Sequence, residues 1–362
     1  MKTKKILTVL GARPQIIKSA IISNQFSKSN HIKEYILHTG QHFDRNMSQI
    51  FFDELSIPKP YRNLDINELN HSDMTAKMIS SIDSVCDEIK PDFILVYGDT
   101  NSTLAGALVA SKKHIPLAHV EAGLRSYNKF MPEEINRVIT DRVSDILFCP
   151  TKNAKDNLSK EGFPIPDRNH SQQIVLSGDI MYDLFLMNKK RFVEVDKYDE
   201  LSGFVLATIH RQENMNLNAL SEIIFGLEEI AKTNKIIFPL HPATRKFIVH
   251  NFKPSLQLKN IHFVEPLSYV EVNSAISKAQ AVITDSGGVQ KEAYFHETPC
   301  ITIRDETEWI ETLQNNSNIL CTAERKDIIN KFNKSKDVDV RYTSEFGNGN
   351  TADIIYNELL GF

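Results

Sequence analysis

The feature that most constrains this chain is a regular alternation of two kinds of segment. Short apolar runs rich in β-branched residues, such as 6–10 and 93–97, are followed by longer segments whose apolar residues recur every three or four positions, such as 15–26 and 102–112. Runs of the first kind are typical of strands in a parallel sheet, and segments of the second kind are typical of the helices that cover it. The alternation predicts an α/β fold of doubly wound, Rossmann-like sheets.

The pattern stops near the middle of the 362 residues and then restarts, and a chain of this length favours two domains. The first half predicts strands at 6–10, 34–38, 93–97, 116–120, 146–149 and 174–176, and helices at 15–26, 47–55, 73–88, 102–112, 132–144 and from about 182. The second predicts strands at 204–208, 235–239, 261–264, 281–284 and 300–303, and helices at 217–232, 269–277, 289–294 and 351–360. The charged stretch 189–202 between them is typical of a linker. We expect domains at 1–188 and 189–349, with a helix within 350–362 that packs back on the first.

Composition excludes several classes of protein. The formal net charge is −4 and the Lys and Arg residues are scattered, so no nucleic-acid partner is expected. No apolar run approaches the roughly 18 residues of a membrane span, so we expect no membrane insertion. The four cysteines lack a C-x-x-C pair, which favours reduced thiols and a cytoplasmic location. These cysteines are Cys86, Cys149, Cys300 and Cys321.

Two glycine-containing turns follow predicted strands, where open α/β sheets bind their ligands. Gly11-Ala12-Arg13-Pro14 opens a helix after the first strand. This turn suits an anion held by backbone N–H groups and Arg13, or equally a tight turn with proline at the first helical position. It lacks the G-x-G-x-x-G spacing, so a bound dinucleotide cofactor is not predicted.

The second turn, Asp285-Ser286-Gly287-Gly288, joins a predicted strand to a helix that contains Glu292. Ser286 and the glycines suit a phosphate, and Glu292 can bind ribose hydroxyls one turn later. A helix capped by Ser286 is the alternative. The carboxylate at this distance favours the nucleotide site, to which Arg304 adds a positive charge after the next strand.

Acidic side chains follow other predicted strands. Asp99 comes after the strand at 93–97, Glu121 ends the next, and Glu133 and Glu134 begin a helix after Pro132. Each alone is more often a helix cap or a complement to the helix dipole. Three elements that bring acids to one cleft favour proton transfer instead.

Two histidines, His210 and His241, follow consecutive strands of the second half. At such positions they suit proton transfer or contact with a diphosphate. No H-x-x-H or H-E-x-x-H spacing accompanies them, so no metal is predicted.

In matching order, these motifs resemble the non-hydrolysing UDP-N-acetylglucosamine 2-epimerase family. The resemblance runs from Gly11 to about Trp309. The motifs are Gly11-Ala12-Arg13-Pro14 with Lys18, Gly98-Asp99, Val120-Glu121-Ala122-Gly123-Leu124-Arg125, Pro132-Glu133-Glu134 with Asn136-Arg137, His210-Arg211, His241-Pro242, and Thr284-Asp285-Ser286-Gly287-Gly288 with Glu292.

The resemblance implies two Rossmann-like domains of glycosyltransferase-B type with an active-site cleft between them, no cofactor, a UDP-sugar substrate and a homodimer. It implies that Asp99, Glu121 and Glu133 are acid/base residues and that His210 assists the leaving diphosphate. The positions implied to bind the UDP-sugar are Arg13, Lys18, Arg137, His241, Ser286, Gly287, Gly288, Glu292 and Arg304.

Three departures from the family pattern bear on the substrate and its regulation. The first turn contains Ala12 and Gln15 where much of the family, with Gly-Thr-Arg-Pro-Glu, has threonine and glutamate. The sequence Thr307-Glu308-Trp309 is the second variant. These variants resemble the branch that acts on UDP-2,3-diacetamido-2,3-dideoxyglucuronate. The segment 41–47 departs from the Gln-His-Arg-Gln-Met type at which bacterial members bind an activating UDP-GlcNAc, so allosteric activation is not assumed.

The chemistry expected of such an enzyme is inversion of C2 in a UDP-N-acetylhexosamine. The C2 hydrogen is not adjacent to a carbonyl carbon, so loss of UDP that gives a 2-acetamidoglycal is a more accessible route than direct deprotonation. This route needs proton-transfer groups on both faces of the sugar and a cationic diphosphate site. A hydrolysing 2-epimerase, a glycosyltransferase of the same architecture and a non-catalytic nucleotide-sugar sensor are the alternatives.

Overall fold

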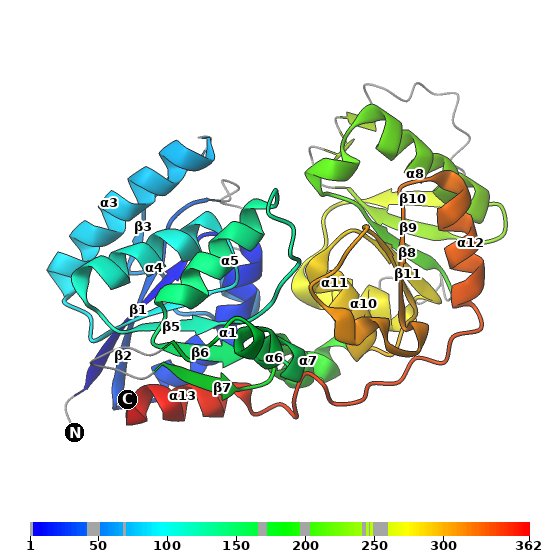
Figure 1. The fold of residues 1–362 in the computed structure, drawn as a ribbon. Helices are drawn as coiled ribbons and strands as arrows, with labels where there is room; N and C mark the ends of the chain where they lie inside the picture. Colours follow the sequence, from blue (N-terminus) through cyan, green and yellow to red (C-terminus); the bar gives the residue numbers. More distant parts are fainter. Residues whose placement is uncertain are drawn as a thin grey trace. The chain divides into compact units, whose positions relative to one another are not determined.

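The computed structural model of the protein describes residues 3–41, 51–67, 70–165, 172–195, 203–240, 244–245, 247–248 and 260–362. The chain divides into two compact units: unit 1 comprises Met1–Leu186 with Ser344–Phe362, and unit 2 comprises Met187–Thr343. Each unit is built on one parallel sheet with helices beside it (Figure 1). This observation confirms the predicted α/β fold with two doubly wound sheets.

The sheet of unit 1 has seven strands in the order β3-β2-β1-β4-β5-β6-β7, all paired in parallel. The strands are β1 (Lys4–Leu10), β2 (Ile32–His38), β3 (Arg62–Asn63), β4 (Phe93–Tyr97), β5 (Leu117–Val120), β6 (Ile146–Cys149) and β7 (Gln173–Leu176). Every residue of β4, β5 and β6 is buried. This burial on both faces explains why the central strands appear in the sequence as uninterrupted apolar runs.

Two helices of unit 1, α3 and α4, form a core with one face of the sheet. The helices of this unit are α1 (Arg13–Ser27), α3 (His71–Ile89), α4 (Asn101–Lys113), α5 (Pro132–Val143), α6 (Lys152–Lys160), α13 (Thr351–Gly361) and the first half of α7 (Ile180–Val193), which continues into unit 2. Met78 and Ile82 of α3 and Val109 of α4 join Leu7 and Val9 of β1 in one apolar cluster. Because these residues recur at helical spacing, the sequence predicted both helices.

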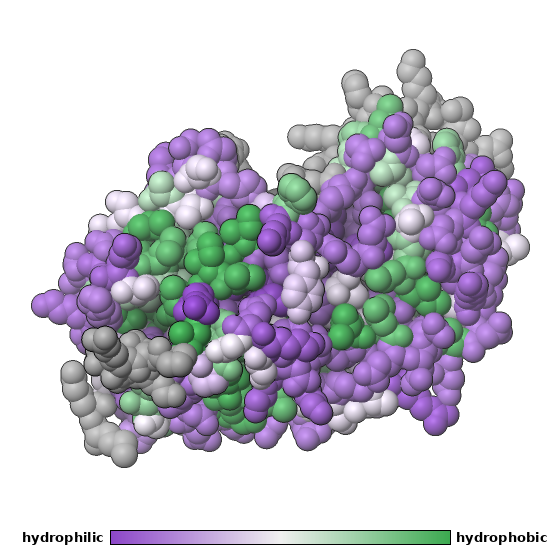
Figure 2. Space-filling view, viewed as in Figure 1, coloured by the Kyte–Doolittle hydropathy of each residue, from purple (hydrophilic) through white to green (hydrophobic). Residues whose placement is uncertain are grey.

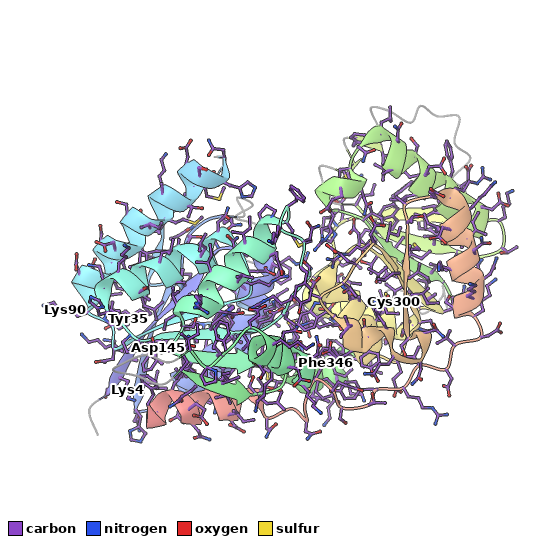
Figure 3. The ribbon with its side chains drawn as sticks, viewed as in Figure 1. Lys4, Tyr35, Lys90, Asp145, Cys300 and Phe346 are labelled. Carbon is purple, nitrogen blue, oxygen red and sulfur yellow. The ribbon has the colours of Figure 1, made fainter. Side chains whose placement is uncertain are left out.

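The C-terminal segment belongs to unit 1, although it follows unit 2 in the chain. Asp353 of α13 accepts a hydrogen bond from Gln25 at 2.8 Å, and Tyr356 is hydrogen-bonded to Ser29 at 2.7 Å. Ahead of the helix, the buried Phe346 (Figure 3) accepts a bond from the backbone N–H of Asp179 at 2.8 Å. The end of the chain therefore stabilises α1 and the start of α7.

The sheet of unit 2 has six strands in the order β10-β9-β8-β11-β12-β13. They are β8 (Val205–Thr208), β9 (Ile236–Pro239), β10 (Ile261–Val264), β11 (Ala281–Thr284), β12 (Cys300–Ile303) and β13 (Asn318–Cys321). The helical segments of this unit are η2 (Gln212–Asn214), α8 (Leu217–Ile230), α10 (Tyr269–Lys278), α11 (Gly287–Phe295), η3 (Ile310–Asn316) and α12 (Arg325–Ser335). Apolar clusters on both faces of the sheet bury it in the same way as the sheet of unit 1.

The structure differs from the sequence predictions in a few elements. The stretch that was predicted to be a linker from residue 189 continues α7 as far as Val193, because Phe192 is buried against Tyr269 and His296 with ring centroids 5.9 and 5.4 Å away. Strands β3 and β13 and helices α6 and α12 were not predicted. They contain few apolar residues or lie at a sheet edge, so their periodicity is weak.

Each sheet has one point where the strand order reverses. In unit 1 the chain continues from β1 to β2 on one side of this point and from β4 to β5 on the other. In unit 2 it continues from β8 to β9 on one side and from β11 to β12 on the other. In open α/β sheets, ligands bind beyond the carboxyl ends of the strands at such a point. Gly11 and Gly98 follow the strands at the first reversal, and Ile209 and Asp285 follow those at the second.

Candidate active site

Three neighbouring side chains hold the turn after β4, which contains Asp99. Arg137 of α5 forms an ion pair with its carboxylate, and Asn136 donates a hydrogen bond to its backbone carbonyl at 2.9 Å. The preceding carbonyl, of Gly98, is hydrogen-bonded to His119 at 2.7 Å. Asp99 keeps 29% of its side chain exposed, whereas Arg137 is 3% exposed. The carboxylate is therefore fixed in direction and still accessible.

Glu121, at the end of β5, has an unusual backbone conformation. Its φ is +78°, in the left-handed region that non-glycine residues rarely occupy and that costs about 1 kcal/mol or more. The N–H groups of Glu121 and Ala122 both donate to the carbonyl of Phe148, at 3.1 and 3.0 Å. Local strain of this kind clusters at functional sites, where it directs a side chain.

That side chain is paired with Lys18 of α1. The Nζ of Lys18 donates to Oε2 of Glu121, and the two side chains are 12% and 10% exposed. Burial lowers the pKa of Lys18, but the nearby charges of Glu121, Asp99 and Asp179 outweigh burial, so its pKa lies above the ordinary value. A Cβ on Gly98 would lie 3.5 Å from the Nζ of Lys18 and 3.7 Å from Oε2 of Glu121. Lys18 is therefore a permanent cation beside the acids.

The two glutamates that begin α5 differ in their surroundings. Glu134 is buried, and its carboxylate accepts bonds from Arg137 at 2.8 Å and from the N–H groups of Ser126 and Tyr127 at 2.9 Å each. These bonds give Glu134 a structural part in the loop before α5. Glu133 is exposed, and its side chain has no hydrogen bond or ion pair with the described residues. Of the three expected acid/base residues, Glu121 is ion-paired with Lys18 and Asp99 with Arg137, and the charge of Asp99 also acts on Lys18, whereas Glu133 belongs to neither pair.

The turn Gly11-Ala12-Arg13-Pro14 has its N–H groups occupied from within unit 1. Oε1 of Gln15 accepts from the backbone N–H groups of Gly11 and Ala12 at 2.8 and 3.1 Å. Its amide nitrogen donates to the Tyr97 carbonyl at 2.8 Å. Arg13 lies over the ring of Phe51 at 4.4 Å. This geometry supports the tight-turn interpretation of the motif, with Gln15 bridging β1 and β4 at the reversal point.

The segment 41–47 lies largely outside the described residues. Only Gln41 is described, and its side-chain oxygen accepts from the N–H and the hydroxyl of Ser102 at 3.2 and 2.9 Å. His241 and Pro242 also lie outside the described residues.

A buried charge network underlies the acids of unit 1. Nδ1 of His119 is 2.7 Å from Oδ1 of Asp141, and the other carboxylate oxygen of Asp141 accepts from Arg125 at 2.7 Å and from the N–H of Gly123 at 3.1 Å. Burial raises the pKa of Asp141, but its bonds to His119 and Arg125 outweigh burial, so the pKa lies below the ordinary value. Arg125 also binds Glu161 through two hydrogen bonds of 2.7 and 2.8 Å.

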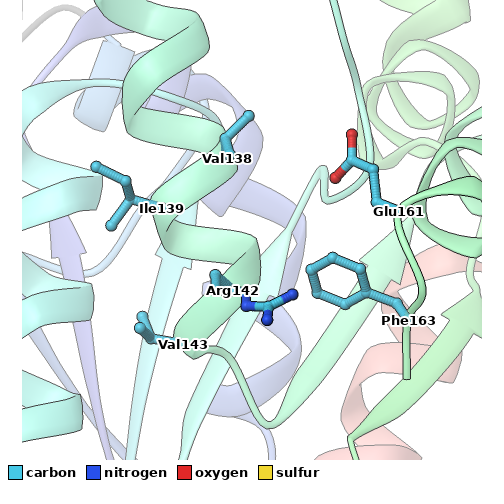
Figure 4. A pocket seen from close by; sticks show the side chains of 6 residues that line it. All are labelled: Val138, Ile139, Arg142, Val143, Glu161 and Phe163. Atoms are coloured by element: carbon cyan, nitrogen blue, oxygen red, sulfur yellow. The ribbon is translucent and has the colours of Figure 1, made fainter. Parts of the chain in front are cut away.

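Glu161 ends this network at a surface pocket beside α5 (Figure 4). The pocket has a volume of about 250 Å³. Its lining is mostly apolar and consists of Val138, Ile139, Arg142, Val143, Glu161 and Phe163. The guanidinium of Arg142 lies 5.8 Å from the centre of the Phe163 ring.

In unit 2, Asp285 organises the loop after β8. Its fully buried carboxylate accepts from the backbone N–H groups of His210 and Arg211 at 3.1 and 2.9 Å and from the amide of Asn214 at 3.1 Å. Nδ1 of His210 lies 3.4 Å from Oδ1 of Asp285, and half of the His210 side chain is exposed. The carboxylate thus lies beside Nδ1, and the half-exposed ring can still be reached by a ligand.

The turn before α11 combines features of an anion site. Ser286 caps the helix by accepting from the N–H of Val289 at 3.4 Å. Arg304, 8% exposed, donates to Glu308 at 2.9 Å, and its Nη1 has no hydrogen-bond partner among the described residues. A Cβ on Gly287 would lie 2.9 Å from Glu308 Oε1 and 3.9 Å from Arg304 Nη1. A helix N-terminus and a guanidinium nitrogen with no partner among the described residues therefore lie close to Gly287, where a side chain would crowd Glu308.

Further findings concern metals and membranes. In the part of the chain that the structure describes, no three His, Cys, Asp or Glu side chains are grouped to hold a metal ion. None of the described helices is both long enough and apolar enough to span a bilayer.

Comparison with known proteins decides the family. The family model described as UDP-N-acetylglucosamine 2-epimerase matches residues 24–360. The chain belongs to the UDP-N-acetylglucosamine 2-epimerase family. It is therefore an isomerase of the epimerase type, and the resemblance found in the motifs is confirmed.

Similar epimerases cover the chain almost completely. It is 45% identical to the UDP-2,3-diacetamido-2,3-dideoxy-D-glucuronate 2-epimerase of Pseudomonas aeruginosa, over 98% of this chain and 99% of that protein. It is 40% identical to a UDP-N-acetylglucosamine 2-epimerase of Methanococcus maripaludis, over 99% of this chain and 98% of that protein. The crystal structure of the Methanocaldococcus jannaschii UDP-GlcNAc 2-epimerase in complex with UDP-GlcNAc and UDP superimposes with a TM-score of 0.91 at 40% identity, over 99% and 100%. The crystal structure of the Neisseria meningitidis UDP-GlcNAc 2-epimerase bound to UDP-GlcNAc superimposes with a TM-score of 0.87 at 31% identity, over 99% of this chain and 100% of that one.

Several residues that hold this epimerase's candidate site together were not predicted from the sequence as site residues. Gln15, His119, Asp141 and Asp285 are all buried and all bond to a turn that carries an expected site residue. One signal was available, because His119 is a polar residue inside the apolar run of β5. A polar side chain in a fully buried strand requires a partner.

Proposed function

We propose that the chain catalyses non-hydrolysing C2 epimerisation of a UDP-N-acetylhexosamine by elimination and re-addition of UDP. The observation that carries the proposal is the combination of two ion pairs, Lys18 with Glu121 and Arg137 with Asp99, near the reversal point of the first sheet. It holds two ionisable acids in fixed directions beside two cations. Family membership supports the same chemistry.

The reaction has two steps in each direction. The C1–O bond breaks with its electron pair going to UDP, and positive charge at C1 makes the C2 hydrogen acidic. Transfer of that proton to a carboxylate then forms the C1–C2 double bond of a 2-acetamidoglycal. UDP returns to C1 while a proton reaches C2 from the opposite face. Acids on both faces and stabilisation of the leaving diphosphate are therefore required.

The acid/base roles belong, in this proposal, to Asp99, Glu121 and Glu133. Lys18 and Arg137 were expected to bind UDP, but both are ion-paired with these acids. We therefore infer that they hold the side chains of Glu121 and Asp99 in place until the substrate binds. The exposed Glu133 would contact the sugar only when substrate is present.

Most of the UDP contacts belong to unit 2 in this proposal. Arg304 and the turn of Ser286, Gly287 and Gly288 would hold the diphosphate, and Glu292 would bind the ribose. His210, oriented by Asp285, would donate from its exposed ring edge to the departing phosphate oxygen. His241 and Arg13 complete the proposed set of UDP contacts. The guanidinium nitrogen of Arg304 that has no partner among the described residues supports this assignment.

The substrate is one of two related sugars. The Pseudomonas relative is an epimerase of UDP-2,3-diacetamido-2,3-dideoxy-D-glucuronate, and the methanogen relatives are epimerases of UDP-N-acetylglucosamine. Each sugar should be incubated separately with the protein in D₂O without an acceptor. An epimerase incorporates deuterium at C2 and forms the C2 epimer still bound to UDP. Release of UDP with the free sugar would favour the hydrolysing reaction, and an unchanged C2 hydrogen would favour a transferase or a sensor.

Site variants test the assigned acids. Asp99→Asn and Glu121→Gln should each lower turnover by about 100-fold or more while UDP still binds. Glu88→Gln is a matched control, because this exposed glutamate of α3 pairs with Arg62 away from the site. Near-normal turnover in both site variants would remove these acids from the mechanism.

We also propose that the protein is a homodimer. Helix α5 exposes Ile135 and Val138, at 47% and 39%, next to the pocket of Figure 4. Figure 2 shows apolar surface gathered over this part of unit 1. Sedimentation of the protein and of Val138→Glu tests the proposal: a dimer that the variant dissociates is expected, and a monomeric wild type would contradict it.

A cytoplasmic location completes the proposal. The four cysteines are buried and free, and burial raises the pKa of Cys86, Cys300 and Cys321 to about 12. Such thiols are inert and form no disulfides with one another, as is usual in a reducing compartment. Cell fractionation with activity assays would test this location.

A further inference from the structure

The strongest unassigned feature of unit 1 is the contact between His119 and the turn that carries Asp99. Nδ1 of His119 is 2.7 Å from Asp141 and Nε2 is 2.7 Å from the carbonyl oxygen of Gly98, and the ring is fully buried. Both neighbours are hydrogen-bond acceptors. Because a neutral imidazole has only one N–H, both contacts are satisfied only by the doubly protonated ring.

The carboxylate that His119 contacts is itself held in place. Asp141 is buried, and its own bonds from Arg125 and from the N–H of Gly123 keep its carboxylate in place. The imidazolium therefore has an ionised and immobile partner inside the protein, as a buried charge requires.

The contact with Gly98 has a direct consequence for Asp99. Gly98 has a φ of +60°, and its N–H donates to the Val120 carbonyl at 3.0 Å. Its carbonyl belongs to the peptide group that joins it to Asp99, so a donor on this oxygen fixes the plane of that peptide. Asn136 and Arg137 then fix the Asp99 carbonyl and carboxylate. The direction of the acid depends on all three bonds.

We propose that His119 is a positioning residue for catalysis: as an imidazolium anchored by Asp141, it fixes the Gly98 carbonyl and so the direction of the Asp99 carboxylate. The proposal rests on the proposed function, since it presupposes that Asp99 handles the C2 proton. A displacement of about 1 Å in a reacting group lowers turnover by about 100-fold. Loss of this bond should therefore reduce kcat, and it should leave UDP binding intact because His119 bonds to Asp141 and Gly98, neither of which is a proposed UDP contact.

Two substitutions separate the contacts of His119. The amide nitrogen of Gln reaches approximately the position of Nε2, so His119→Gln keeps a donor to Gly98. The amide nitrogen of Asn reaches approximately the position of Nδ1, so His119→Asn keeps only the bond to Asp141. His114→Asn is the control, because His114 is exposed at the end of α4 with a φ of +54° that asparagine tolerates.

The experiment measures kcat, KM, UDP affinity and melting temperature for these variants, with deuterium incorporation at C2 as the assay. We expect kcat to fall by about 100-fold in His119→Asn and by less than about 10-fold in His119→Gln, with KM and UDP affinity within about 3-fold of wild type. Equal kcat in both variants, or a loss that follows the melting temperature alone, would overturn the positioning role. No deuterium incorporation by the wild type would instead overturn the proposed function, and the positioning role with it.

A spectroscopic measurement on the wild type keeps the proposal testable if a variant fails to fold. Long-range ¹H–¹⁵N correlation of the histidine rings, with His119 assigned by its absence in His119→Gln or by specific labelling, reports the proton on each nitrogen. Protons on both nitrogens are expected. A single proton on the ring would overturn the proposal whatever the kinetics show.

Discussion

Glu34 of β2 is a partly buried residue whose carboxyl group lies inside the protein, and it should make stability depend on pH although the proposed mechanism does not use it. Its Oε1 accepts hydrogen bonds from Thr8 at 2.5 Å and Ser23 at 3.1 Å, whereas the buried Oε2 has no partner among the described residues. Burial raises the pKa of Glu34 from 4.5 to about 7, and the two hydroxyl bonds only partly oppose this effect.

The sign of the effect follows from this raised pKa. Below pH 4.5 the carboxyl is neutral in the folded and unfolded chains, and no stability is lost. Between pH 4.5 and about 7 the unfolded chain ionises first, so the folded state loses stability, and above about pH 7 the loss is constant. At 1.36 kcal/mol per unit, the rise in pKa from 4.5 to about 7 corresponds to a loss of about 3 kcal/mol in the free energy of unfolding. Glu34→Gln should remove this loss.

Hydrogen exchange of the β2 amides measures the free energy of opening in unit 1. The free energy of opening should be larger in Glu34→Gln than in the wild type, and this difference should increase by about 2 to 3 kcal/mol from pH 5 to pH 8. The fluorescence of Trp309, the sole tryptophan, reports unit 2 and should not change. Glu88→Gln controls for the loss of a carboxylate, since the pKa of Glu88, lowered mainly by its bond to Tyr61, lies below this pH range. A difference that stays constant from pH 5 to 8 would refute the reasoning.

Three further predictions concern single positions. Gly123 has a φ of +81° and a Cβ there would lie 2.3 Å from the Ala154 carbonyl oxygen, so Gly123→Ala should lower the unfolding free energy of unit 1 by about 2 kcal/mol or more, measured by hydrogen exchange. Gly287→Ala would bring a methyl group to 2.9 Å from Glu308, so UDP affinity measured by calorimetry should fall about 10-fold or more, and unchanged affinity would argue against a phosphate site at this turn. Asp285→Asn leaves one acceptor oxygen for the loop after β8, so urea unfolding followed by Trp309 fluorescence should show a loss of about 2 kcal/mol.

The fold was predictable because its central strands are buried on both faces. β4 and β11 contain no exposed residue, so each forms a continuous apolar run in the sequence. β3 was missed because it has two residues, both exposed. α6 was missed because only Ala154 and Leu158 provide apolar periodicity over nine residues.

The candidate site was predictable only in part. The rule that ligands bind at strand ends identified Asp99, Glu121, His210 and Ser286 from local sequence. It did not reveal that Lys18 pairs with Glu121, because this contact joins residues 103 positions apart. The roles of His119 and Asp285 were hidden for the same reason, since each acts through hydrogen bonds to a turn that is distant in the sequence.

The central claim is that the bond between C1 of the sugar and UDP breaks and re-forms in each turnover. A substrate that carries ¹⁸O in the oxygen between C1 and the β-phosphate tests this claim directly. Once UDP is released in the site, rotation of its terminal phosphate makes the three oxygens equivalent. We therefore predict that ¹⁸O moves to non-bridging positions in recovered substrate and in product, as seen by ³¹P NMR. Epimerised product with all ¹⁸O still in the bridge would contradict the elimination mechanism.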